Sequence, residues 1–111
     1  MTTIQVKYTA LQLGEICHKL NIVEGEPDLQ ESYSITQYEA SAIYQIFYAA
    51  KPNVPVQFDS KFCDLIIGEL EDVQSMWAHN AADNRDASEL SMASTCAAAI
   101  RKTKHAMRQA T

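Results

Sequence analysis

The segment SKFCDLIIGELEDVQSMWAHNA, residues Ser60 to Ala81, decides the fold. Its large apolar side chains recur at helical spacing within one arc of roughly 80°: Phe62, Ile66, Leu70, Val73 and Trp77. Polar side chains point the other way: Asp64, Glu71, Asp72, Ser75 and His79. Burial of each large apolar side chain stabilises a fold by roughly 1.5–3 kcal/mol. We therefore expect a helix over about residues 60–81 whose apolar face anchors the core.

A second segment, SELSMASTCAAAIRKTKHAM, follows at Ser88–Met107 and predicts a helix over about 87–109. Asp86 and Glu89 have the spacing of a capping box at its start. One side of this helix is made mostly of small residues: Leu90, Ala93, Cys96, Ala97, Ile100 and Met107. Small side chains let a neighbouring helix come close. We expect this slim face to pack on the bulky face of the preceding helix, at Ile66, Leu70 and Trp77.

The N-terminal half predicts two further helices. Thr36 and Glu39 form a capping box before a helix that Pro52 ends. The inward stripe expected for this helix consists of Ala42, Ile43, Ile46, Phe47 and Ala50. A weaker helix is expected over residues 9–21, because Gly14 costs on the order of 1 kcal/mol against alanine. Residues 22–33, IVEGEPDLQESY, are expected to form an acidic loop.

Residues 3–8 and 54–58 alternate between apolar and polar side chains, which allows a minor two-stranded β-ribbon. The chain has 111 residues, 47% of them hydrophobic, which suffices for one core. The predicted fold is mainly α: a small three- to four-helix bundle forming a single domain over residues 1–111. The uncharged run 90–100 is too short to cross a membrane, which needs roughly 20 apolar residues.

The three cysteines, Cys17, Cys63 and Cys96, lie far apart and form no CxxC pair. We interpret them as buried thiols of a protein in the reducing cytosol. The N-terminal MTTIQVKYT lacks the apolar run of a signal peptide, so secretion is not expected.

Charge is distributed unevenly along the chain. The net charge is −5; all 14 acidic residues lie before residue 101, whereas the last eleven residues carry four of the nine bases. An acidic body argues against direct nucleic-acid binding. A helix-turn-helix is also disfavoured, because twelve residues separate the two candidate helices and no Arg or Lys occurs between Gln37 and Ala50. The basic tail mainly complements the dipole of the last helix.

No catalytic or metal-binding pattern is found in the sequence. His18, His79 and His105 are isolated, and neither HxxxH nor HExxH occurs. GxSxG, GxGxxG and the P-loop are absent too, and the acidic loop lacks the calcium-binding pattern. We therefore expect no enzyme activity, no cofactor and no metal.

The favoured hypothesis is a non-catalytic module that binds a protein partner with a basic surface, because complementary charge speeds encounter and suppresses wrong partners. In size and charge the chain looks like the small accessory or inhibitor proteins that bacteriophages and mobile elements encode, though no motif identifies a family. An inhibitor of a nucleic-acid-handling host complex is the favoured role. The expected contact residues are the following: Glu24, Glu26, Asp28, Glu31, Tyr44, Tyr48, Asp64, Glu71 and Asp72.

Two alternatives stay open. The last helix has a second small, uncharged side that could join two copies in a structural homodimer or larger oligomer: Ser91, Ser94, Thr95 and Ala98. The same helix could serve an oligomer that binds a small anion or nucleotide, with Arg101 and Lys104 as the anion contacts.

Overall fold

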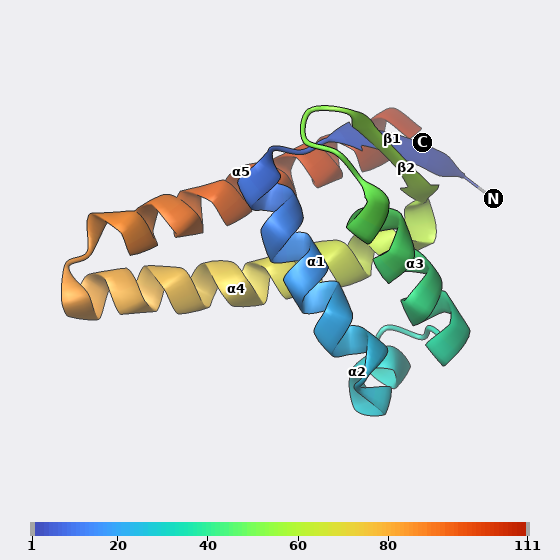
Figure 1. Cartoon of the computed structure of the whole chain (residues 1–111), viewed down its shortest axis with the longest axis horizontal. Helices are drawn as coiled ribbons and strands as arrows, with labels where there is room; N and C mark the ends of the chain where they lie inside the picture. The colour runs from blue at the N-terminus through green and yellow to red at the C-terminus, as the bar shows by residue number, and fades with distance from the viewer. Residues whose placement is uncertain (1, 111) are drawn as a thin grey trace.

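A hairpin of two long helices, α4 (Cys63–Asn84) and α5 (Ala87–Ala110), runs the length of the molecule (Figure 1). The computed structural model describes residues 2–110. Six shorter elements of this described chain pack around one half of the hairpin: β1 (Thr3–Lys7), α1 (Ala10–Glu24), α2 (Pro27–Ser32), α3 (Gln37–Ala49), β2 (Pro55–Asp59) and the 3-10 helix η1 (Ser60–Phe62). The mainly helical architecture predicted from the sequence is confirmed.

The bulky face of α4 packs on the slim face of α5. Ile66 and Leu70 on α4 are almost completely buried, and so are Cys96 and Ala99 on α5. Trp77 is half-buried against the same core, as expected. The expected seam is wrong at one end, since Leu90 is 58% exposed. Leu90 lies close to the hairpin turn, where α4 has no large apolar side chain after Trp77 to cover it.

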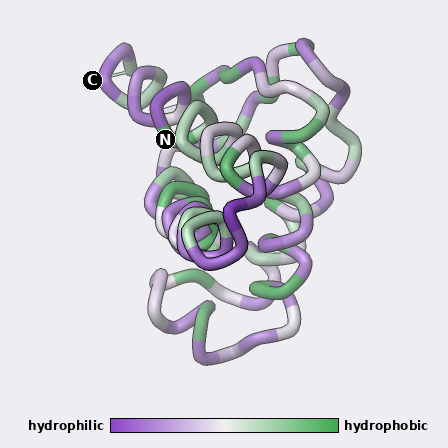
Figure 2. The backbone as a smooth tube through the Cα atoms, turned by 90° about the vertical axis from the view of Figure 1, so that its left-hand side faces the viewer, coloured by the Kyte–Doolittle hydropathy of each residue, from purple (hydrophilic) through white to green (hydrophobic). Residues whose placement is uncertain are grey.

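The turn between α4 and α5 is short and polar. Arg85 ends α4 in the left-handed conformation, with φ 52° and ψ 40°. The Asp86 carboxylate then accepts hydrogen bonds from the backbone N–H and the hydroxyl of Ser88, at 2.8 and 2.7 Å. Only half of the expected capping box forms, because Glu89 returns no bond to Asp86 among the described hydrogen bonds. Figure 2 looks onto this hydrophilic end of the hairpin.

The predicted β-ribbon is confirmed. β1 and β2 are antiparallel, with Ile4 opposite Phe58 and Val6 opposite Val56. These four side chains are buried, whereas the alternate residues face outward. The buried Tyr8 hydroxyl, 2.7 Å from Thr103 Oγ1, fastens the end of β1 to α5. Packing on helices supplies the support that a lone two-stranded ribbon lacks.

The expected loop over residues 22–33 is wrong. α1 continues to Glu24, and Pro27 begins the separate helix α2. Proline is well suited to the first helical position, because its fixed φ is helical and its missing N–H has no partner there anyway. The Gln30 amide then bonds the carbonyl oxygens of Val23 and Glu24, which joins α2 to the end of α1.

The capping box of α3 forms as predicted, with reciprocal bonds between Thr36 and Glu39. The inward stripe of α3 is rotated from the expected one. Ile43 and Phe47 are buried as predicted, and Ala40 joins them, but Ala42 and Ile46 are exposed. α3 packs mainly on α1 and on β2, so only a narrow strip of its surface is covered.

Candidate partner-binding site

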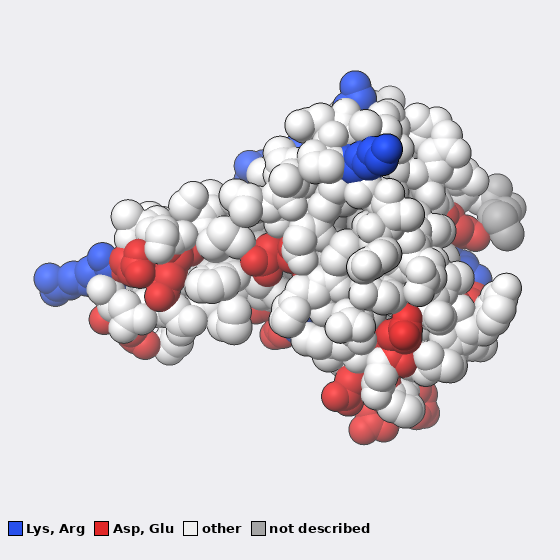
Figure 3. All heavy atoms as spheres, in the orientation of Figure 1, with Lys and Arg blue, Asp and Glu red and all other residues white. Residues whose placement is uncertain are grey.

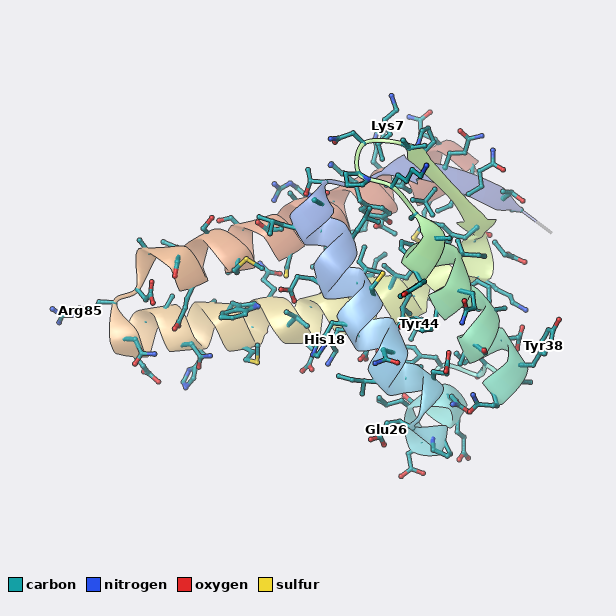
Figure 4. The ribbon with its side chains drawn as sticks, viewed as in Figure 1. Lys7, His18, Glu26, Tyr38, Tyr44 and Arg85 are labelled. Atoms are coloured by element: carbon teal, nitrogen blue, oxygen red, sulfur yellow. The ribbon has the colours of Figure 1, made fainter. Side chains whose placement is uncertain are left out.

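A cavity of about 420 Å³ lies where α1 crosses the middle of α4. Apolar side chains form one part of its lining: Ile22, Val73, Met76 and Trp77. Charged and polar side chains form the other part: Glu15, His18, Lys19 and Asp72. We call this cavity the α1–α4 groove; Figure 4 shows His18 on α1 at the crossing.

The groove is open because the hairpin extends past α1 (Figure 1). α1 crosses α4 near its middle, and the second half of α4 extends beyond α1. Ile22 and Met76 are consequently 37% and 49% exposed, although both are large and apolar. Exposed apolar side chains gathered in a cavity with a polar rim are typical of a site that binds another molecule.

A partly buried polar cluster joins the two walls of the groove. Lys19 Nζ lies 3.5 Å from Glu69 Oε1 and 3.3 Å from Asp72 Oδ2. The Tyr33 hydroxyl donates to the other Glu69 oxygen at 2.8 Å. Burial, and then the hydrogen bond and charge of Glu69, raise the pKa of Tyr33 well above its ordinary value. The cluster thereby joins α1, the end of α2 and α4.

The carboxylate at the centre of this cluster, Glu69, is only 6% exposed. Its side of α4 faces Lys19 and Tyr33, whose cation and hydroxyl satisfy the carboxylate. Gly68 makes this approach possible, since a Cβ there would lie 2.6 Å from the Tyr33 hydroxyl oxygen. The sequence offered no signal for a contact between residues so far apart along the chain.

The structure places the expected acidic contacts in two regions. Asp72 lines the α1–α4 groove, and Glu71 is exposed beside it on α4. Asp64 is exposed two turns earlier, on the same side of α4 as Glu71. The other four acidic residues lie where α1 ends and α2 begins: Glu24, Glu26, Asp28 and Glu31. Figure 3 shows acidic side chains gathered at that lower end of the molecule.

The expected aromatic contacts lie on α3. Tyr44 is half-buried and Tyr48 is 71% exposed, with ring centroids 5.9 Å apart. Neither ring lines the α1–α4 groove. Tyr38, at the start of α3, points away from the rest of the molecule (Figure 4) and is 83% exposed.

The expected oligomer contacts lie along α5: Ser91 and Ser94 are exposed, and Thr95 and Ala98 are half-buried. The Thr95 hydroxyl donates to the Ser91 carbonyl oxygen at 3.0 Å. Arg101 and Lys104, the expected anion contacts, are exposed on the same helix and line none of the cavities described here.

Of the groove residues, only Asp72 was named as a contact from the sequence, and Val73 and Trp77 were expected in the core. Lys19 and Met76 were missed, and so were three further residues of α1: Glu15, His18 and Ile22. They lie at i, i+3 and i+7 and therefore share one side of a helix. The expected helix ended at residue 21, which placed Ile22 in a loop and hid this pattern.

The described side chains give little support to a metal-binding or catalytic role. No group of three or more His, Cys, Asp or Glu within residues 2–110 could hold a metal ion. Burial raises the pKa of both Cys63 and Cys96 to about 11, which keeps these thiols protonated and poorly nucleophilic. None of the helices over residues 2–110 is both long enough and apolar enough to cross a bilayer.

Comparison with models of protein families, with curated proteins and with solved structures finds no match to this chain.

Proposed function

We propose that the protein is a non-catalytic binding module and that the α1–α4 groove captures a basic, amphipathic segment of a protein partner. The observation that carries this proposal is the combination of exposed apolar and acidic groups in one cavity. Ile22 and Met76 offer apolar contact, while Glu15 and Asp72 offer carboxylates beside it. Such a surface fits a segment with apolar residues on one side and Lys or Arg on the other.

The charge of the rim supports a cationic partner. Lys19 is the only cation among Lys and Arg that lines the groove, and its two carboxylate neighbours, Glu69 and Asp72, outweigh it. The Asp72 side chain is still 75% exposed despite this contact, so its oxygens can accept further hydrogen bonds. Glu71 adds another carboxylate on the adjoining surface of α4.

The biological role that follows is inhibition by occupation. Basic segments of nucleic-acid-handling proteins bind phosphate, and an acidic module seated on such a segment excludes the nucleic acid. This role extends the binding proposal and depends on it. It predicts that nucleic acid and the module compete for one surface of the partner.

The test is site-specific photo-crosslinking in a host lysate. A photoreactive phenylalanine replaces Met76 in one sample and the exposed Leu90 in another, and captured proteins are identified by mass spectrometry. We expect a partner that crosslinks at Met76, is lost with the double variant Glu71→Lys and Asp72→Lys, and survives Glu24→Lys with Glu26→Lys. Equal capture from Leu90, or capture that neither charge reversal weakens, would contradict the groove as the binding site.

A second candidate function, a structural homo-oligomer, is favoured by one observation. The free end of the hairpin has a hollow lined mainly by Ala78, Ala81, Ala82 and Ala87, beside the exposed Leu90. Two hairpins packed through such small residues would bury both the hollow and the Leu90 side chain. Light scattering after size exclusion tests it: an oligomer joined through this hollow must dissociate with Ala82→Arg and Leu90→Arg, whereas the binding module keeps the same mass.

A further inference from the structure

The largest cavity described in the molecule lies apart from the α1–α4 groove, between β1 and the last turns of α5. Its volume is about 510 Å³. One wall is the whole of β1, Thr3–Lys7, and the other includes Lys102, His105 and Ala106 of α5. Five consecutive strand residues line one cavity only when the strand presents its edge to it, because successive side chains point to opposite faces.

The hydrogen bonds of the ribbon show which backbone groups face this cavity. Ser60 N–H donates to the Thr2 carbonyl oxygen at 2.7 Å, and Asn53 N–H donates to that of Tyr8 at 2.8 Å. In an antiparallel pair these inward bonds recur at every second residue. Thr2, Ile4, Val6 and Tyr8 therefore direct their backbone groups toward β2, whereas Thr3, Gln5 and Lys7 direct theirs away from it.

The outward groups have no partner in the described chain. The sheet of residues 2–110 has two strands, so β1 has one free edge. No hydrogen bond within that range uses the backbone N–H or C=O of Thr3, Gln5 or Lys7. A free strand edge of this kind is a template onto which another extended chain can pair.

The walls of the cavity are basic. Lys7, Lys102 and His105 line it, and no Asp or Glu does. None of the three lies within ion-pair distance of a carboxylate among residues 2–110. The Lys102 ammonium donates instead to the neutral Gln12 side chain at 2.9 Å. This charge is opposite to that of the α1–α4 groove, so the two cavities suit different ligands.

We propose that the free edge of β1 accepts an extended acidic segment of a partner protein as a third strand, with its carboxylates contacting Lys7 and Lys102. Backbone bonds to Thr3, Gln5 and Lys7 supply affinity without regard to sequence. Specificity comes from the α5 wall, toward which every second residue of the added strand points. A stretch of about 17 Å, five residues of strand, pairs with the full edge.

The probe is a fluorescent heptapeptide with alternating glutamate and valine, measured by fluorescence anisotropy with the full chain. A matched peptide carries N-methyl groups on alternate residues, which removes backbone donors and leaves the charge unchanged. We expect the plain peptide to bind at least tenfold more tightly than the methylated one. Equal affinity for the two, or no binding of the plain peptide at millimolar protein, overturns the proposal.

The strand edge is tested by a matched pair of proline variants. Gln5 and Gln57 face each other in the register, and each directs its backbone N–H to the outer edge of its own strand. Proline is tolerated at such edge positions, since no ladder bond is lost. Gln5→Pro should weaken peptide binding at least tenfold, whereas Gln57→Pro should not; equal effects would contradict strand addition at β1. The peptide comparison with the unaltered chain remains decisive if either variant fails to fold.

The charge contribution is tested by Lys102→Glu against Arg101→Glu, which changes charge equally outside the cavity. We expect a fivefold or greater loss for Lys102→Glu alone. A single-stranded oligonucleotide serves as a competitor, because the same cations could contact phosphate. Displacement of the peptide at an oligonucleotide concentration below that of the peptide would assign the cavity to nucleic acid and overturn the proposal.

Discussion

At the scale of single residues, the Lys19–Glu69–Tyr33 cluster shows how a buried charge is retained in this fold. An unpaired carboxylate at 6% exposure would cost several kcal/mol, but Glu69 has a cation on one oxygen and a hydroxyl on the other. The cluster depends on Gly68, because a side chain at that position meets the Tyr33 ring.

This dependence gives a double-mutant prediction. Gly68→Ala should destabilise the protein by about 1–3 kcal/mol, because the new Cβ overlaps the Tyr33 hydroxyl. With Tyr33→Phe in place the 2.6 Å contact is gone and the ring atoms lie at 3.2 Å. Alanine then gains about 1 kcal/mol of helix propensity over glycine, so the same change should be neutral or stabilising. Urea unfolding of the four proteins measures the coupling, and simple additivity would refute the contact.

The two tyrosines with raised pKa values predict a loss of stability in alkali. Tyr8 and Tyr33 both have a folded pKa above the ordinary value of 10.0, chiefly through burial. A group whose folded pKa is raised stabilises the fold below its unfolded pKa, and the stabilisation is lost as pH rises above it. We expect the urea midpoint to begin to fall above about pH 8.5, where the thiols of Cys63 and Cys96 ionise in the unfolded chain, and to fall more steeply beyond about pH 10, where the tyrosines do. Tyr33→Phe should make this fall shallower; an unchanged slope would exclude a contribution from Tyr33.

At the scale of elements, helix ends were read from the sequence with unequal success. Thr36 with Glu39 marked the start of α3 because the capping residues act locally. The loop expected over residues 22–33 was wrong, because proline is compatible with both a loop and a first helical turn. The Gln30 bonds that favour the helix involve residues six and seven positions away. A helix end fixed by neighbouring residues could therefore be predicted from the sequence. A segment that fits both a loop and a helix could not, because contacts with distant residues decide between them.

The same limit applies to the candidate site. Asp72 and Glu71 were named as expected contacts because their side of α4 is plainly polar in the sequence. Ile22 and Met76 were not, because their exposure depends on where α1 crosses α4, which no single segment encodes. Glu69 was not named as a functional residue from the sequence, because its partners Lys19 and Tyr33 come from α1 and the end of α2.

The end of α4 gives a prediction about the hairpin turn. Arg85 adopts the left-handed conformation, with φ 52°, which costs a residue with a Cβ roughly 1 kcal/mol or more and costs glycine little. Arg85→Gly should therefore raise stability by about 0.5–1 kcal/mol. Asn84→Gly, one residue earlier within the helix, should instead lower it slightly, by about 0.3 kcal/mol. Thermal melts of both variants test the assignment, and destabilisation by Arg85→Gly would show that this turn adopts another conformation.

At the scale of the whole molecule, the packing is uneven. The other helices and the ribbon surround one half of the hairpin, and the other half projects from them, so that the molecule extends 43 Å along its longest axis. The α1–α4 groove lies at the border between the covered and the free half of the hairpin. The cavity beside β1 lies at the other end of the hairpin, along the last turns of α5. Each of them combines rigid core elements with surface that no other element covers.

This uneven packing predicts two levels of local stability within the same helices. Residues 82–88 are all exposed, whereas Leu65, Ile66 and Leu70 are 1% exposed. Opening of a segment costs free energy in proportion to the apolar contacts it breaks, so the free end should open far more often than the enclosed part. We expect amide hydrogens over residues 78–92 to exchange at least 100-fold faster than those over 65–70 under native conditions, as measured by mass spectrometry.

Binding of a partner in the α1–α4 groove should slow exchange around Met76 first, and a second copy packed on the hairpin should instead protect residues 78–92. Uniform protection along α4 in the free protein would mean that the projecting half is covered in solution, and would favour the oligomer over the binding module.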